Sequence, residues 1–300
     1  MAAVIKLKRG TSTPSTSDIA SGEVAVDTSA QKLYINDSGT VKEIGGGGGV
    51  SSDAQGNTVG GTNAGDSFTG TDAEKNTLFG YNAGTAITSG DQHTAVGYDS
   101  LKAVTTAEKN TAIGIRSGEQ LTTGIENTFG GYIAGRGITT GSGNVALGAY
   151  SLRNTSTNSH NVAIGYRAIN NGTGASNVAM GYFAGAELDG SENVAIGTYA
   201  LTDATTDKNV GVGASSGRSV STGEKNTILG FEAGYSGTNN LTTGSNNILI
   251  GHEAAASSAT VSNEITLGDT NITKFRIPGL GFELDTDSSS GFILDFGSVA

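Results

Sequence analysis

Acidic side chains recur at fixed places in this 300-residue chain, and they are the first residues that could carry chemistry. A pair of carboxylates can hydrolyse a glycosidic bond, one as the acid and the other as the base or nucleophile. The recurring acids each precede Asn or Lys-Asn: Glu74, Glu108, Glu126, Glu192, Asp207 and Glu224. A catalytic pair is normally unique, whereas these acids repeat in register beside lysines. The pattern favours a solvated charged edge, and we expect no catalytic residues.

The other reactive side chains show no pattern of a metal centre. His93, His160 and His252 share no metal-ligand spacing, and the chain contains no cysteine. Neither a Walker loop nor an H-E-x-x-H motif occurs. We therefore predict a protein that is not an enzyme and that uses neither a metal nor a cofactor.

A five-residue motif occupies most of the chain, and its clearest copies read NVAIG at 161–165 and 193–197. The first residue of each copy is here called the anchor. Gly stands four residues after every anchor, and Ala or Ser three residues further on. The spacing between anchors is 16 or 17 residues, except for one of 21. The anchors are Asn76, His93, Asn110, Asn127, Asn144, Asn161, Asn177, Asn193, Asn209, Asn226 and Asn247, with weaker copies at Asn57 and Asn263.

Each motif has the alternation of a short β-strand. The first and third residues after the anchor are mostly β-branched or apolar, and the second is often Ala. In NVAIG, Val162 and Ile164 would therefore lie on one face and Ala163 on the other. The Gly would permit a backbone angle that a Cβ forbids. A second short strand would follow, often opened by an aromatic residue such as Tyr166.

A unit of 16–17 residues cannot bury an apolar face alone, but stacked copies can. The repeat predicts an all-β chain with a parallel β-solenoid over residues 57–262, each coil having two short strands and two turns. The anchors would form a ladder in which each amide bonds to the next. The predicted coil core consists of Val145, Leu147, Val162, Ile164, Val178, Met180, Val194 and Ile196.

The second residue of each motif would then face outwards. Small apolar residues on a flat outer face indicate close packing against another chain, so they form the predicted trimer interface; the alternative is a tight corner of the coil. Leu78, Phe129, Ile228 and Leu249 are bulkier there, which would fit splaying apart or contact with flanking domains. The predicted interface residues are Ala95, Ala112, Ala146, Ala163, Ala179 and Ala195.

The residues outside the repeats divide into three segments. Residues 1–45 have the pattern of a small β domain, with strands near 3–8, 23–27, 32–36 and 40–44 and a turn at NDSG. Residues 46–56 are a Gly-rich linker. Residues 263–300 are a predicted C-terminal cap, in which an apolar alternation around DSSSG indicates a hairpin. Its apolar residues are Phe282, Leu284, Phe292, Leu294 and Phe296.

Composition excludes several classes of partner. The formal net charge is −11, which argues against nucleic acid as a main partner. No run of about 18 apolar residues is present, so we expect no membrane insertion. The first ten residues, MAAVIKLKRG, lack the apolar stretch of a secretion signal.

Two resemblances add to this interpretation. The run NVAIGYRA resembles the head repeats of trimeric autotransporter adhesins of the YadA type, which implies a left-handed β-roll and three chains to a trimer. The segments LKRG (7–10), GEVAVDT (22–28) and KLYIND (32–37) are similar to the N-terminal module of bacteriophage tail fibres and tropism-determinant proteins. In that family the module fastens the fibre to the virion.

The resemblances imply a virion protein of a phage tail, either a fibre or a fibre-like adaptor. Its partners would be two further copies of itself, other tail or baseplate proteins and a host surface receptor. The basic residues Lys6, Lys8 and Arg9 would dock the module, or else form an ordinary solvated strand edge. The alternatives are a bacterial adhesin head and a polysaccharide-degrading tailspike.

Overall fold

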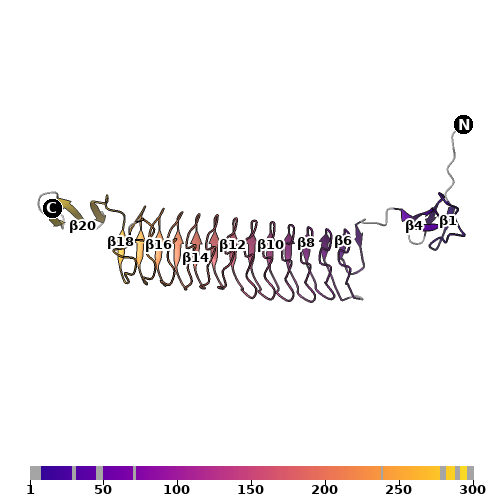
Figure 1. Cartoon of the computed structure of the whole chain (residues 1–300), viewed down its shortest axis with the longest axis horizontal. Helices are drawn as coiled ribbons and strands as arrows, with labels where there is room; N and C mark the ends of the chain where they lie inside the picture. Colours follow the sequence, from indigo (N-terminus) through magenta and orange to yellow (C-terminus); the bar gives the residue numbers. More distant parts are fainter. Residues whose placement is uncertain are drawn as a thin grey trace, which may run out of the picture.

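The computed structural model describes residues 8–28, 32–44, 50–69, 72–237, 239–277, 282–287 and 291–295. These residues are all-β and form a 4-stranded, a 14-stranded and a 3-stranded sheet. The 14-stranded sheet runs along a rod, with the small sheets beyond its two ends (Figure 1). No helix in the described part of the chain is long and apolar enough to cross a membrane.

The rod is a parallel β-solenoid, as predicted. Successive coils pair in register, so that Val162, Ala163 and Ile164 lie beside Val178, Ala179 and Met180. Each coil contributes one strand of three residues: β6 (Thr58–Gly60), β7 (Thr77–Phe79), β8 (Thr94–Val96), β9 (Thr111–Ile113), β10 (Thr128–Gly130), β11 (Val145–Leu147), β12 (Val162–Ile164), β13 (Val178–Met180), β14 (Val194–Ile196), β15 (Val210–Val212), β16 (Thr227–Leu229), β17 (Ile248–Ile250) and β18 (Ile265–Leu267).

The two faces of the strand are the reverse of the prediction. Ala163 is fully buried inside the coil, whereas Val162 and Ile164 are only partly covered. The same correction applies to the predicted interface residues, which all lie in the core: Ala95, Ala112, Ala146, Ala163, Ala179 and Ala195. It applies equally to the predicted core residues, which all lie on the outer face: Val145, Leu147, Val162, Ile164, Val178, Met180, Val194 and Ile196.

The reason for the reversal is the narrow interior of the coil. The second residue of the motif shares the interior with the Ala or Ser that lies seven residues after the anchor. In the coil of Asn161 these are Ala163 and Ala168, both fully buried together with Ile169. At the majority of strand centres, a close-packed interior of this width leaves room for nothing larger than a methyl group. Small residues there mark the inside of the coil and not a contact between chains.

The predicted second strand of each coil is absent from the described coils, because the backbone turns sharply after the Gly. The sixth and eighth residues after the anchor have positive φ, for example 54° at Arg116 and 60° at Gly118. These are left-handed conformations, which a β-strand cannot contain. The chain therefore returns to the next strand through turns.

The predicted asparagine ladder is present, with a more specific geometry. Oδ1 of Asn161 accepts the backbone N–H of Asn177 at 2.9 Å, and Nδ2 of Asn161 donates to the carbonyl of Gly174 at 3.1 Å. Each anchor amide thus bonds to the next coil and to the far end of its own coil. The anchors are fully buried, so each of these bonds satisfies a group that water cannot reach.

His93 serves as a rung of the same ladder. Its Nδ1 accepts the N–H of Asn110 at 3.2 Å, and its Nε2 lies 2.8 Å from the carbonyl of Ala107. An imidazole can fill both roles only as the neutral tautomer with its proton on Nε2. Burial lowers the pKa of His93, which keeps the ring in that form.

Carboxylates end the ladder on both sides. Asp53 accepts the N–H of Asn57 at 2.8 Å, which is the bond that a preceding anchor would accept. Glu264, and not Asn263 as predicted, occupies the last anchor position, since its N–H donates to Asn247 at 3.0 Å. Its carboxylate folds back to accept the N–H of Ser257 at 2.9 Å. Hydrogen bonds from Asn57 and Ser257 lower the pKa of Asp53 and of Glu264 respectively, so both groups stay ionised.

The Gly four residues after each anchor forms a close backbone contact between coils. Gly148 has φ of 130°, and a Cβ there would lie 2.6 Å from the carbonyl oxygen of Gly165 in the next coil. Both the backbone angle and the spacing therefore require glycine. The same residue recurs in every coil because every coil makes this contact.

Most bulky strand centres are balanced by glycine within the same coil. Leu101, Leu152, Ile169 and Leu201 stand eight residues after their anchors, and each of these coils has Ala at its strand centre. Leu78, Phe129, Ile228 and Leu249 are fully buried strand centres, so they do not splay or contact flanking domains as suggested. The first three of these coils carry Gly84, Gly135 and Gly234 at the eighth position, and the large side chain fills the space left there. The coil of Leu249 carries Ala255 instead, and Leu249 lies beside Gly234 of the preceding coil. When the strand centre is large the residue at the eighth position is small, and the reverse, so the interior stays filled.

Differences in coil length are absorbed in the turns. Nδ2 of Asn161 donates to a carbonyl 13 residues later, Nδ2 of Asn144 to one 14 residues later and Nδ2 of Asn226 to one 18 residues later. The strand register is the same in all three cases. The extra residues of the long coil lie around Ser236, outside the ladder.

The two ends of the solenoid differ. At the first coil, β5 (Ser51–Ser52) pairs antiparallel with β6, within the segment predicted as a linker; residues 46–49 of that segment lie outside the described residues. At the last coil, β18 extends the solenoid beyond the predicted boundary at residue 262. A separate sheet follows, made of β19 (Lys274–Ile277), β20 (Phe282–Asp287) and β21 (Gly291–Asp295). Strands β20 and β21 form the predicted hairpin; Phe296 lies outside the described residues.

The N-terminal module is a sheet in the order β1 (Lys8–Gly10), β2 (Val24–Asp27), β3 (Lys32–Asp37) and β4 (Thr40–Ile44). Three of the four strands lie where the sequence places them; residues 3–7 of the other lie outside the described residues. The turn at NDSG joins β3 to β4, with positive φ at Ser38 and Gly39. Ile19, Ala25 and Tyr34 form the small core of the module.

Because the strand centre and the eighth position share one space, a substitution at one position should be rescued by a substitution at the other. Phe129→Ala should lower the free energy of unfolding by about 3–5 kcal/mol, because it leaves a cavity. Gly135→Leu alone should also destabilise, because a leucine would overlap the Phe129 ring. The double variant should recover most of the loss, since Leu152 and Leu201 adopt the same backbone conformation beside Ala. Thermal unfolding of the unsubstituted chain, the two single variants and the double variant measures the coupling between the two positions. Additive effects of the two substitutions would contradict a shared space.

The neutral state of His93 predicts a pH dependence of stability. Because the folded pKa lies below the ordinary value of about 6.5, the contribution of His93 is complete above that pH and is lost as pH falls towards the folded pKa. His93→Asn should remove this component, since asparagine keeps both bonds at any pH. The melting temperatures at pH 7.5 and pH 5 test this, with His160→Asn as the matched exposed control. A decline that is the same in His93→Asn and in the unsubstituted chain would refute this assignment.

Candidate binding surfaces

An extended apolar surface covers the outer strand face, which we define as the first and third residues after the anchors from β6 to β18. Its third positions hold an almost unbroken line of apolar side chains. Ile113 is 51% exposed, Leu147 40% and Leu229 45%. The first positions add Thr in the first coils and, apart from Thr227, Val or Ile in the later ones. Exposed apolar surface on this scale is typical of a contact with another molecule.

The recurring acids lie on a charged edge, as predicted. Glu74 pairs with Lys75 at 3.0 Å, Glu224 pairs with Lys225 at 2.6 Å, and the side chains of these pairs are 44–66% exposed. Asp207 instead accepts the N–H of Ser191 in the preceding coil at 2.8 Å. Exposed ion pairs of this kind contribute little to stability. They supply solvation and coil-to-coil contacts.

The histidines lie apart from one another. His93 is a ladder rung, His160 is an exposed turn residue, and His252 stacks on Phe231 with ring centroids 5.3 Å apart. No group of three or more His, Asp or Glu side chains that could hold a metal occurs among the described residues.

One serine motif was not singled out in the sequence. Gly213–Gly217 (GASSG) matches the G-x-S-x-G pattern of serine hydrolases. Its Ser215 has φ of 56° in a coil turn, whereas the hydrolase motif joins a strand to a helix. The match follows from the small residues that the coil needs at these positions.

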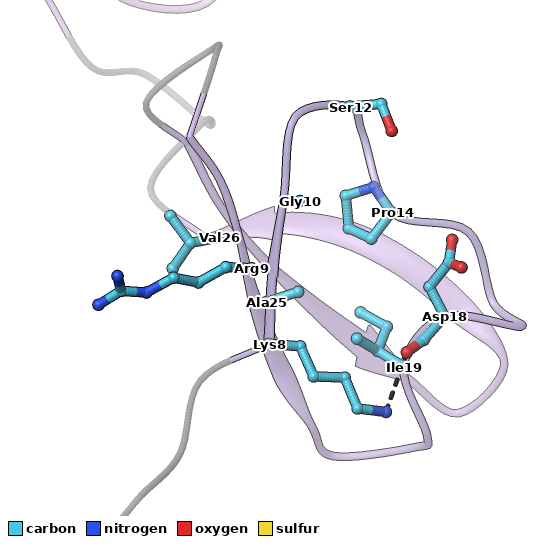
Figure 2. A pocket seen from close by; sticks show the side chains of 9 residues that line it. All are labelled: Lys8, Arg9, Gly10, Ser12, Pro14, Asp18, Ile19, Ala25 and Val26. Atoms are coloured by element: carbon cyan, nitrogen blue, oxygen red, sulfur yellow. Dashed lines mark hydrogen bonds between the residues drawn. The ribbon is translucent and has the colours of Figure 1, made fainter.

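The N-terminal module carries a pocket of about 360 Å³, lined by residues of β1, β2 and the loop between them (Figure 2). Lys8 reaches from β1 across its rim, donating to the carbonyl of Asp18 at 2.9 Å and to Glu23 at 2.6 Å. The bond from Lys8 is the main cause that lowers the pKa of Glu23. The charge of Lys8 is therefore paired with groups of the module itself.

Arg9 differs from Lys8 because neighbouring strand residues point to opposite faces. Figure 2 shows its side chain directed away from Lys8 and Asp18. Arg9 is exposed, whereas Lys6 lies outside the described residues. Of the predicted basic cluster, Arg9 thus presents a guanidinium to solvent and Lys8 stabilises the loop.

Comparisons with protein-family models, with curated proteins and with solved structures found no match to this chain.

Proposed function

We propose that this chain is a rod-forming structural protein of a bacteriophage tail, a fibre or a fibre-like adaptor. In this proposal the N-terminal module docks to other tail or baseplate proteins. The solenoid assembles with two further copies into a stiff trimeric rod, and the C-terminal sheet lies towards a host receptor or another fibre protein. The role is mechanical, and no residue of the chain acts as a catalyst.

The outer strand face is the observation that carries this proposal. A face that repeats identically along the rod can be covered along its whole length by the same face of another copy. Three copies arranged about one axis would bury the apolar line of Leu147, Ile164 and Ile196 between them. The number three comes from the resemblance of the repeats to adhesin heads.

The N-terminal module supports a phage tail over a bacterial surface. It is a separate small sheet whose sequence resembles the virion-attachment module of tail fibres. Arg9, exposed on its surface, is the residue we expect to contact the tail, whereas Lys8 maintains the fold of the module.

The trimer predicts opposite effects for adjacent residues. Ile164→Asp should dissociate the rod and leave each coil folded, because three carboxylates would be buried at the shared axis, at about 3–5 kcal/mol for each uncompensated charge. Ala163→Arg should instead unfold the coil, because the fully buried methyl group has no path to solvent. Light scattering gives the mass, and circular dichroism reports the fold.

Glu192→Gln, on the exposed charged edge, is the matched control and should change neither property. A monomeric mass for the unsubstituted chain, or a trimer that survives Ile164→Asp, would contradict an interface on the outer strand face.

The location of the protein tests the proposed function itself. Mass spectrometry should find the chain in purified phage particles, and labelled antibodies should place it on the tail in electron micrographs. Its presence in a bacterial envelope fraction and absence from particles would favour the adhesin head. New reducing ends after incubation with host polysaccharide would favour the tailspike and contradict a purely mechanical role.

A further inference from the structure

One flank of the solenoid, next to the outer strand face, carries aromatic and arginine side chains interspersed along the rod. They stand six or nine residues after the anchors, in the turns that follow the glycines. We call the set Tyr150, Arg153, Arg167, Phe183, Tyr199 and Arg218 the aromatic–arginine strip. The solenoid needs none of these residues for its ladder or its core.

The strip is continuous from coil to coil. The guanidinium of Arg167 lies 5.6 Å from the ring centroid of Tyr150 and 5.3 Å from that of Phe183. The ring of Phe183 is 5.6 Å from that of Tyr199, and the guanidinium of Arg218 is 4.6 Å from the ring of Tyr199. Cations and rings therefore form a line parallel to the rod, with one step per coil.

The charges of the strip are not neutralised by the protein. Arg116 and Arg136, on earlier coils of the same flank, both pair with Glu119. In the described part of the chain, no carboxylate forms an ion pair with Arg153, Arg167 or Arg218. The Nε atoms of Arg153 and Arg167 are buried and have no hydrogen-bond partner there, so an external anion would meet the other nitrogens of these guanidiniums. Three partly exposed arginines thus have no carboxylate partner, on a chain of net charge −11.

We propose that the aromatic–arginine strip binds a linear carboxylated polysaccharide laid along the rod. Aromatic rings stack against the C–H faces of sugar rings, and the planar guanidinium forms paired hydrogen bonds with a carboxylate. The coil spacing of about 4.8 Å is close to the length of one sugar ring, so successive sugars can meet successive coils.

The balance of groups favours this ligand over other polyanions. Nucleic acid carries a phosphate at every nucleotide and needs dense positive charge, which the acidic rod would repel. A carboxylated saccharide spaces its charges between apolar ring faces, matching guanidiniums that are interspersed with aromatic rings. The proposal extends the proposed role in host attachment by naming a receptor class, but the binding itself is independent of where the rod is mounted.

The test uses the full-length protein and polygalacturonate as the probe, with methyl-esterified polygalacturonate as the uncharged control. We expect binding of the free acid that weakens with salt, and at least about tenfold weaker binding of the ester. Arg167→Ala and Tyr199→Ala should each reduce affinity for the acid by about tenfold. Arg167→Lys keeps the charge but loses the planar fork, and should give an intermediate affinity.

Controls separate binding from folding and from assembly. Lys225→Ala removes a cation from the opposite, charged edge and should leave affinity unchanged. Circular dichroism and mass should be the same for every variant compared. No binding of polygalacturonate, equal binding of acid and ester, or equal binding of polyglutamate would overturn the proposal. So would affinity that is unchanged in Arg167→Ala. None of these outcomes bears on the presence of the protein in phage particles, which is measured separately.

Discussion

Every coil must form backbone hydrogen bonds with the next coil, at the distance that separates neighbouring β-strands. The rest of the structure depends on that constraint. The anchor amide maintains this contact where the chain leaves a turn, because it accepts one N–H from the next coil and donates to a carbonyl of its own coil. The glycine four residues later allows the same spacing where the chain enters a turn. The anchor is nearly always asparagine and the glycine is constant, because they lie at the two ends of the strand that sets the spacing.

The interior follows from the same constraint. A coil of 16 or 17 residues that also holds a buried amide has little volume left, and it fills that volume with alanine, serine and one larger aliphatic side chain. Larger strand centres lie beside a glycine that leaves space for them, in the same coil for Phe129 and Gly135 and in the preceding coil for Leu249 and Gly234. The apolar side chains that do not fit inside are displaced to the outer strand face. The shortage of interior volume is thus the reason that the rod presents an apolar surface.

The repeat in the sequence was enough to predict the solenoid, its coil length and the anchor ladder, and the pattern of residues 1–45 predicted most of the strands of the N-terminal module. The direction of the strand faces could not be predicted, because alternation shows that Ala163 and Ile164 lie on opposite faces and not which face is inside. Hydrophobicity alone favours Ile164 as the inner residue, but the narrow coil places the smaller Ala163 inside. The second strand was predicted wrongly because Arg116 and its equivalents carry no sign of their left-handed backbone. Surfaces whose members come from several coils, such as the aromatic–arginine strip, emerge only once the register is known.

The carboxylates of Asp53 and Glu264 close the ladder at its two ends, while the coils between them are nearly interchangeable. A gene built in this way can gain or lose whole coils by unequal recombination between similar repeats, and both closing residues are kept. Because all copies in the proposed trimer would be translated from one gene, their lengths would change together and their faces would stay matched. The repeat therefore makes the length of the rod a heritable quantity that varies in steps of one coil.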